Sequence, residues 1–144
     1  MPSLTELASY LESIAPAQIA ESWDNVGVLV RCAQEVTGVL CALDITPATV
    51  REARAVGCNV IVSHHPVIFR PLKELCQDDV PALLVREGVS AVCMHTNLDK
   101  AQGGVNDVLA QALGLRDTEP FAGGIGRVGA LPETMEAAAF AQFV

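Results

Sequence analysis

The three histidines of this 144-residue chain are its residues best suited to chemistry. His64 and His65 stand side by side at the end of an apolar run, and Pro66 follows them directly. His95 ends a second apolar run and opens the stretch HTNLD, whose last residue is Asp99. Imidazole and carboxylate groups are common ligands of divalent first-row metal ions. The pattern therefore predicts a metal site.

The adjacency of His64 and His65 limits how the two rings could bind ions. Successive side chains of an extended backbone point in opposite directions, and Pro66 biases His65 towards an extended conformation. Two such rings do not readily chelate one ion. We expect them to lie around two ions, or around one ion and a substrate. The alternative is that the pair caps the edge of a sheet while His95 satisfies a backbone carbonyl.

Alternating strand and helix signals predict an α/β fold with a mixed, largely parallel sheet flanked by helices. Strands are expected near residues 26–30, 36–44, 58–66, 89–99 and 125–131. Helices are expected after Ser3, which starts a capping box with Glu6, after Thr46, after Asp78 or Asp79, and after Gly104. A last helix is expected to start near residue 133. No linker is visible, so residues 1–144 are expected to form a single domain.

Three polar clusters fall where these strands are expected to end, at Asp44, at the histidine pair and at His95–Asp99. In open α/β sheets, ligands gather beyond the carboxyl ends of the strands. The clusters are therefore expected to converge on one edge of the sheet.

The composition restricts the possible partners. The net charge is −8 with 9 lysines and arginines, which disfavours a nucleic-acid partner. The apolar runs are far shorter than the roughly 20 residues of a membrane span. Hydrophobic residues make up 51% of the chain and charged residues 18%, so we expect a large interface with a partner chain or a missing remainder.

The five cysteines show no C-x-x-C spacing and are expected to be buried free thiols. Together with the lack of a signal peptide, they favour a cytoplasmic protein.

Three other features permit chemistry but have simpler explanations. Cys93 and His95 fall on the same side of one strand, which permits a nucleophilic pair. Gly103–Gly104 precedes a helix, where anions can bind, but a plain loop explains it equally well. Trp23 and Asp24 read as packing and turn chemistry, with a site role for Asp24 kept open.

Four segments together resemble the Nif-three-like (YbgI/YqfO) family, whose members are named GTP cyclohydrolase 1 type 2 homologues. They are WDNVGVLV, LDITPATVREA, SHHPVIFRPL and HTNLDKAQGGVNDVLAQALGL, in this order. The resemblance runs from about Leu4 to the end of the chain. It implies a Nif-three-like fold, a dinuclear metal centre and a homo-oligomer in the form of a toroidal hexamer.

The resemblance also implies roles for particular residues. It assigns His64, His65 and Asp99 as ligands of two divalent transition-metal ions, Zn, Fe or Mn, and makes His95 a catalytic acid–base candidate. Family members are longer and add a histidine and a glutamate from a C-terminal H-x-x-x-E segment. The chain is therefore expected to be an N-terminal portion, with a metal site that is incomplete or empty.

The expected function is a metal-dependent hydrolase in which metal-activated water attacks a small-molecule substrate, possibly a nucleotide such as GTP. Arg70, Lys73 and Lys100 lie near the motifs and could contact phosphate. The alternatives are a non-enzymatic metal-binding or regulatory protein, and a fragment without a complete metal site.

Overall fold

The computed structural model describes residues 1–144, which divide into two compact units, Met1–Leu98 and Asp99–Val144. The first unit carries the main sheet and its flanking helices. The second contains a hairpin and two helices. That residues 1–144 form a single domain stays a prediction.

The first unit is built on a four-stranded sheet in the order β1-β4-β3-β2. The strands are β1 (Gly27–Val30), β2 (Val39–Ala42), β3 (Val60–Ser63) and β4 (Ser90–Cys93). The pairs β2–β3 and β3–β4 are parallel, whereas β1 runs antiparallel to β4 at the edge. This confirms the predicted mixed, largely parallel sheet.

Local signals in the sequence explain where the helices of this unit begin and end. The helices are α1 (Leu4–Ile14), a 3-10 turn η1 (Ala17–Ile19), α2 (Pro47–Ala55) and α3 (Val80–Glu87). The capping box at α1 is formed: the Glu6 amide donates to Ser3 Oγ at 3.1 Å, and the Ser3 amide donates to Glu6 Oε2 at 2.7 Å. Thr46 caps α2 through its side chain, and Gly88 ends α3 with a left-handed φ of 66°.

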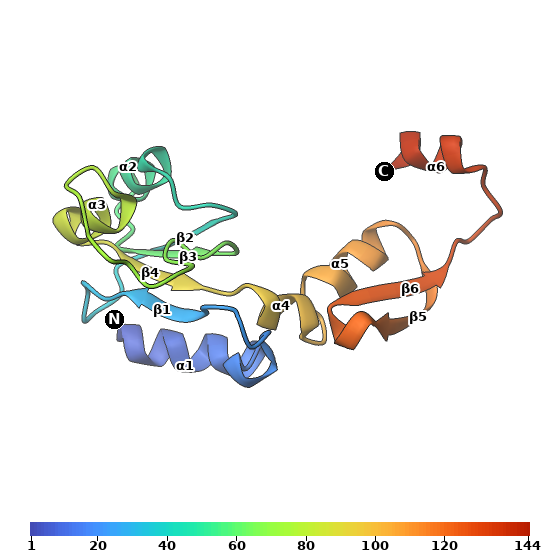
Figure 1. The fold of residues 1–144 in the computed structure, drawn as a ribbon, viewed down its shortest axis with the longest axis horizontal. Coiled ribbons are helices and arrows are strands. Elements are labelled where there is room, and N and C mark those ends of the chain that lie inside the picture. The colour runs from blue at the N-terminus through green and yellow to red at the C-terminus, as the bar shows by residue number, and fades with distance from the viewer. The chain divides into compact units, whose positions relative to one another are not determined.

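Both faces of the sheet are covered, α2 and α3 lying on one side and α1 on the other (Figure 1). Side chains alternate along the strands as a pleated sheet requires. Ile61 and Ala91 pack towards α2 and α3 and share one core cluster with Leu84 of α3. Val60 and Val92 pack towards α1. The near-continuous apolar runs of β3 and β4 therefore reflect burial on two faces.

The second unit begins inside the short helix α4 (Thr96–Lys100), which spans the boundary between the units. Its other elements are α5 (Val105–Ala112), β5 (Arg116–Phe121), a 3-10 turn η2 (Ala122–Gly124), β6 (Gly126–Ala130) and α6 (Ala137–Phe143). β5 and β6 form an antiparallel hairpin. The sequence did not predict α4 or β5. The fully exposed strand β5 has no apolar alternation that could have signalled it.

An ion pair joins α5 to the hairpin of this unit. The Arg127 guanidinium binds Asp107 and also donates to the Gly124 carbonyl at 2.8 Å. The bonds from Arg127 and from the Gly103 amide lower the pKa of Asp107. None of the helices of the chain combines the length and the apolarity needed to cross a membrane.

The packing of α3 gives a direct test of the core. Leu84 is fully buried between α3 and the sheet, whereas its neighbour Val85 is 61% exposed. We expect Leu84→Ala to lower the free energy of unfolding by about 2–5 kcal/mol, because it leaves a cavity. The matched control Val85→Ala should change it by less than about 0.5 kcal/mol, measured by urea denaturation. Equal effects would mean that α3 does not pack as described.

Candidate metal centre

All three imidazoles of the chain gather where β3 and β4 end. His64 and His65 follow β3, and His95 follows β4. One nitrogen of each ring lies within 4.8 Å of the corresponding nitrogens of the other two. The ring centroids are 5.2 Å apart for His64–His65, 5.2 Å for His64–His95 and 5.8 Å for His65–His95. We call these three residues the imidazole cluster.

The backbone turns at the histidine pair, which explains how neighbouring rings share one cluster. The amides of His64 and His65 donate to the successive carbonyls of Ala42 and Leu43, at 3.1 and 2.9 Å. Successive amides of a strand point to opposite neighbours, so the chain has left the extended conformation. Extended geometry predicts that the two rings point to opposite faces, and the turn of the backbone prevents this. The assignment of one ring to each of two ions stays a prediction.

Every ring of the imidazole cluster is held through its Nδ1 atom. His64 Nδ1 lies 3.0 Å from the Met94 carbonyl, His65 Nδ1 lies 2.8 Å from Asp44 Oδ1, and His95 Nδ1 lies 2.8 Å from Asp24 Oδ1. Carbonyl and carboxylate oxygens only accept, so Nδ1 carries the proton in each ring. The lone pair of the neutral ring then lies on Nε2, as in most histidines that bind metals.

The buried carboxylate of Asp24 organises the His95 side of the cluster. Its side chain has no exposed surface, and it accepts from His95, from the Asn25 amide, and from both the amide and the hydroxyl of Thr96. Burial by itself would raise the pKa of Asp24, but these hydrogen bonds outweigh it and the pKa is lowered. Asp24 therefore stays ionised. The sequence left a site role open for it, and in the structure it holds the His95 ring and the turn at Thr96 in place.

A second buried side chain fixes the turn after β4. Asn97 Oδ1 accepts from the His95 amide at 2.9 Å, and its Nδ2 donates to the Ala15 carbonyl at 2.7 Å. The turn that carries His95 is thereby tied to the end of α1. Sequence reasoning did not single out Asn97, although it lies inside HTNLD.

The other two predicted carboxylates lie in different settings. Asp44 follows β2, is 57% exposed, and bonds to His65, which confirms that the predicted strand ends meet. Asp99 is half-buried in α4 and belongs to the second unit. Its role as a metal ligand stays a prediction. His95 Nδ1 bonds a carboxylate, that of Asp24, and not the backbone carbonyl that the alternative expected.

Trp23 does not pack in a core, contrary to the expectation from sequence. It is 58% exposed, and its ring centroid lies 6.5 Å from that of His95. Phe69 is 43% exposed, and its ring centroid lies 6.0 Å from that of Trp23 and 6.5 Å from that of His95. Two of the six aromatic residues of the chain therefore border the imidazole cluster.

Cys93 does not form a nucleophilic pair with His95. Its thiol is buried and donates to the His64 carbonyl at 3.2 Å. Burial, together with the nearby charge of Asp24, raises the pKa of Cys93 to about 12. All five cysteines are free thiols, but the expectation that all are buried is wrong, because Cys41 and Cys76 are exposed.

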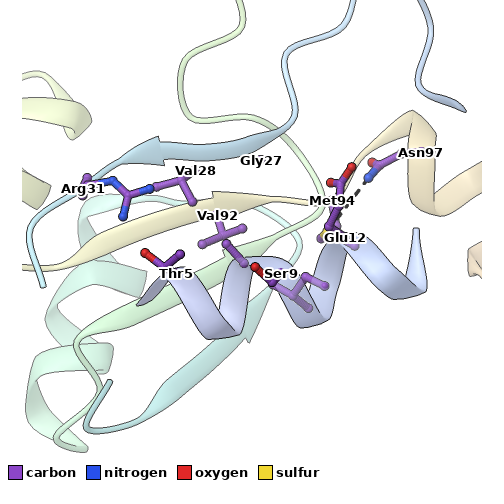
Figure 2. A pocket seen from close by; sticks show the side chains of 11 residues that line it. Thr5, Ser9, Glu12, Gly27, Val28, Arg31, Val92, Met94 and Asn97 are labelled. Atoms are coloured by element: carbon purple, nitrogen blue, oxygen red, sulfur yellow. Dashed lines mark hydrogen bonds between the residues drawn. The ribbon is translucent and has the colours of Figure 1, made fainter. Parts of the chain in front are cut away.

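Cavities in the first unit include two that differ in their distance from the imidazole cluster. One of about 300 Å³ lies between α1 and strands β1 and β4, is lined mostly by small or apolar side chains, and touches none of the imidazoles (Figure 2). The other, of about 360 Å³, is bordered by His65, Asp44 and Asp79. We favour the second as the approach to the cluster because it is the one that reaches an imidazole.

Asp24 and Asp44 each hold one imidazole and differ in burial, which provides a matched pair of variants. Asp24→Asn places amide hydrogens against a network of donors, so we expect the metal-free protein to lose about 1–3 kcal/mol of unfolding free energy. Asp44→Asn should cost less than about 1 kcal/mol, because the pair is solvated. Urea denaturation in EDTA measures both. Equal losses would contradict the assigned burial of Asp24.

Thiol labelling tests the state of Cys93. In the native protein at pH 8, Cys41 and Cys76 should react rapidly with Ellman's reagent, while Cys93 should react only after unfolding, because its thiol is buried and protonated. Labelled sites are read by peptide mass spectrometry, and a Cys93→Ser variant identifies the slow site. Rapid labelling of native Cys93 would restore the nucleophile interpretation.

The chain is similar to known proteins along its whole length. A family model described as Duf34/NIF3 (NGG1p interacting factor 3) matches residues 2–144. A GTP cyclohydrolase 1 type 2 homolog of Staphylococcus aureus strain MRSA252 is 42% identical over 118 residues, which cover 79% of this chain and 32% of that protein. One from Lactococcus lactis subsp. lactis strain IL1403 is 42% identical over 125 residues, covering 82% and 49%. The chain thus spans about a third of the first relative and about half of the second.

Solved structures agree with the fold. A Bacillus cereus protein related to NIF3 superposes with a TM-score of 0.76 at 40% identity, covering 83% of this chain and 34% of that one. Reduced HcgD from Methanocaldococcus jannaschii gives a TM-score of 0.81 at 28% identity, covering 89% and 54%. Sequence and fold together confirm the resemblance drawn from the four segments, and the chain belongs to the Duf34/NIF3 family.

Proposed function

We propose that the imidazole cluster is a metal centre and that the protein is a metal-dependent hydrolase. One observation carries the proposal: three Nδ1 atoms are bound to acceptors, and the three rings come together. A core histidine needs one satisfied nitrogen, whereas three rings that each bind an acceptor through Nδ1 at one place are typical of histidines that bind a metal through Nε2.

The donor set fits a divalent transition metal. Nε2 atoms of His64, His65 and His95 would be the nitrogen ligands of the centre, with Asp99 as a carboxylate ligand, and Zn, Fe and Mn all accept such ligands. When bound, the metal supplies Lewis-acid activation of water. We propose two ions, as the family resemblance implies, and a homo-oligomer in the form of a hexamer.

The role of His95 follows from its partner. The ionised carboxylate of Asp24 holds Nδ1 of the ring and so fixes its orientation, which suits a metal ligand and equally a group that accepts a proton from water through Nε2. Because the ring stands as close to His64 as His65 does, we assign His95 first as a ligand. Its predicted role as general acid or base is the second assignment.

The substrate class rests on the relatives. Curated relatives bear the name GTP cyclohydrolase 1 type 2 homolog, so we propose a nucleotide as the small-molecule substrate of a cytoplasmic enzyme. Exposed cationic side chains at Arg70 and Lys73 follow the histidine loop and would contact phosphate groups. Binding of metal without turnover would instead support a non-enzymatic metal-binding protein.

The first experiment measures metal and turnover in the same samples. We expect at least one Zn, Fe or Mn ion per purified chain by ICP-MS, and GTP loss by liquid chromatography that stops on chelation and returns with Mn²⁺. His64→Ala and His95→Ala should each weaken metal binding at least about tenfold, since each removes a ligand. Asp78→Asn, an exposed carboxylate outside the cluster, is the control.

Three outcomes separate the alternatives. Metal retained by both histidine variants would exclude the cluster as the metal centre. Metal bound only by the wild-type and control proteins, without turnover of GTP or of a phosphoester panel, would support the binding protein and contradict the hydrolase. No metal in any sample after soaking would leave the fragment interpretation.

A further inference from the structure

Two exposed aromatic rings stand at the imidazole cluster, and packing does not account for them. Trp23 and Phe69 lie edge to face, with an interplanar angle of 69°, and each also meets the His95 ring edge to face. More than half of Trp23 and two fifths of Phe69 remain exposed. Aromatic side chains contribute most when buried, so rings placed beside a polar cluster in this way favour contact with a ligand.

Hydrogen bonds of the neighbouring residues fix the backbone that carries both rings. Trp23 precedes Asp24, whose buried carboxylate is anchored by four donors. Asn25 Nδ2 donates to the Ile68 carbonyl at 2.6 Å and so ties the segment that carries Trp23 to the segment that carries Phe69. The exposure of the rings is therefore a property of an organised surface and does not come from a loosely held loop.

The size of this surface points to a small molecule. An aromatic side chain buries at most about 150–250 Å². Two half-exposed rings thus offer far less than the roughly 800 Å² per partner of a stable protein interface. One flat ring system is the occupant that matches, since it stacks on an aromatic face whatever its identity.

We propose that Trp23 and Phe69 form a stacking platform, on which a planar nitrogen heterocycle of the substrate stacks on one ring, meets the other edge to face, and is held against the His95 side of the imidazole cluster. This inference rests on the proposed function, because it takes the cluster as the reaction site. It adds a ring-binding subsite to the metal centre. The heterocycle could be a free base or the base of a nucleotide, and the platform recognises the feature that they share.

Trp23 is the one tryptophan of the chain and reports on the platform directly. Guanosine and adenosine should quench its fluorescence saturably in Zn²⁺-loaded protein, while ribose should not. GTP binding more tightly than guanosine would identify a nucleotide, and equal affinities would identify the base alone as the recognised part. Both results support the platform.

Variants locate the effect. Phe69→Leu should weaken nucleoside binding about fivefold to 150-fold, the range measured for loss of one stacking partner. Phe69→Tyr, which keeps a flat ring, should retain binding. Phe121→Leu is the matched control, because Phe121 is 52% exposed and lies on β5 in the second unit. Trp23→Leu, followed by equilibrium dialysis, should weaken binding in the same range.

Zn²⁺ content is measured beside nucleoside affinity so that the two proposals fail separately. Wild-type affinity in Phe69→Leu with normal Zn²⁺ content would overturn the platform. So would a lack of nucleoside binding by Zn²⁺-loaded wild-type protein. Trp23 emission that shifts with protein concentration alone would also overturn it, since a second copy would then cover the rings. Nucleoside binding by a protein that takes up no Zn²⁺ would overturn the metal centre and leave the platform in place.

Discussion

The register of three parallel strands is the constraint on which the site depends. Ala42 pairs with Ser63, and Ser63 pairs with Cys93, so β2, β3 and β4 all stop on one line across the sheet. The residues that follow must then emerge side by side, which brings Asp44, the histidine pair and His95 together. A one-residue slip would exchange the side chains that pack towards α1 with those that pack towards α2 and α3. The burial of both faces therefore also positions the imidazoles.

The cluster is held unequally along this line. On one side the buried side chain of Asp24 bonds to His95 and also accepts from two backbone amides and one hydroxyl. On the other side Asp44 meets His65 in solvent, where an ion pair contributes little. The rigid half suits a group whose position must not change. The solvated half borders the 360 Å³ cavity and can adjust to what enters there.

The sequence predicted those features that follow from local signals. The capping box at Ser3 and the cap at Thr46 each depend on a few neighbouring residues, and each occurs as expected. The convergence of strand ends was predictable for the same reason, because parallel strands expose their carboxyl ends at a common edge. What could not be predicted depends on contacts between distant residues. The hydrogen bond between Thr96 and Asp24 and that between Asn97 and Ala15 join residues 72 and 82 positions apart in the sequence. The turn that brings the neighbouring histidines together depends on carbonyls contributed by another strand.

The antiparallel edge strand has a consequence for how the fold can vary. Because β1 runs against β4, its beginning lies at the edge where the other strands finish, and the segment before Gly27 supplies Trp23 and Asp24 there. This end of the sheet thus combines the C-terminal ends of β2, β3 and β4 with the N-terminal end of β1. The opposite edge, where the turns at Gly57 and Gly88 lead into β3 and β4, carries none of these side chains. We therefore expect a change in loop length, or a grafted reporter peptide, to be tolerated better at the end of the sheet that carries these turns, because an insertion at the other end would displace the histidines.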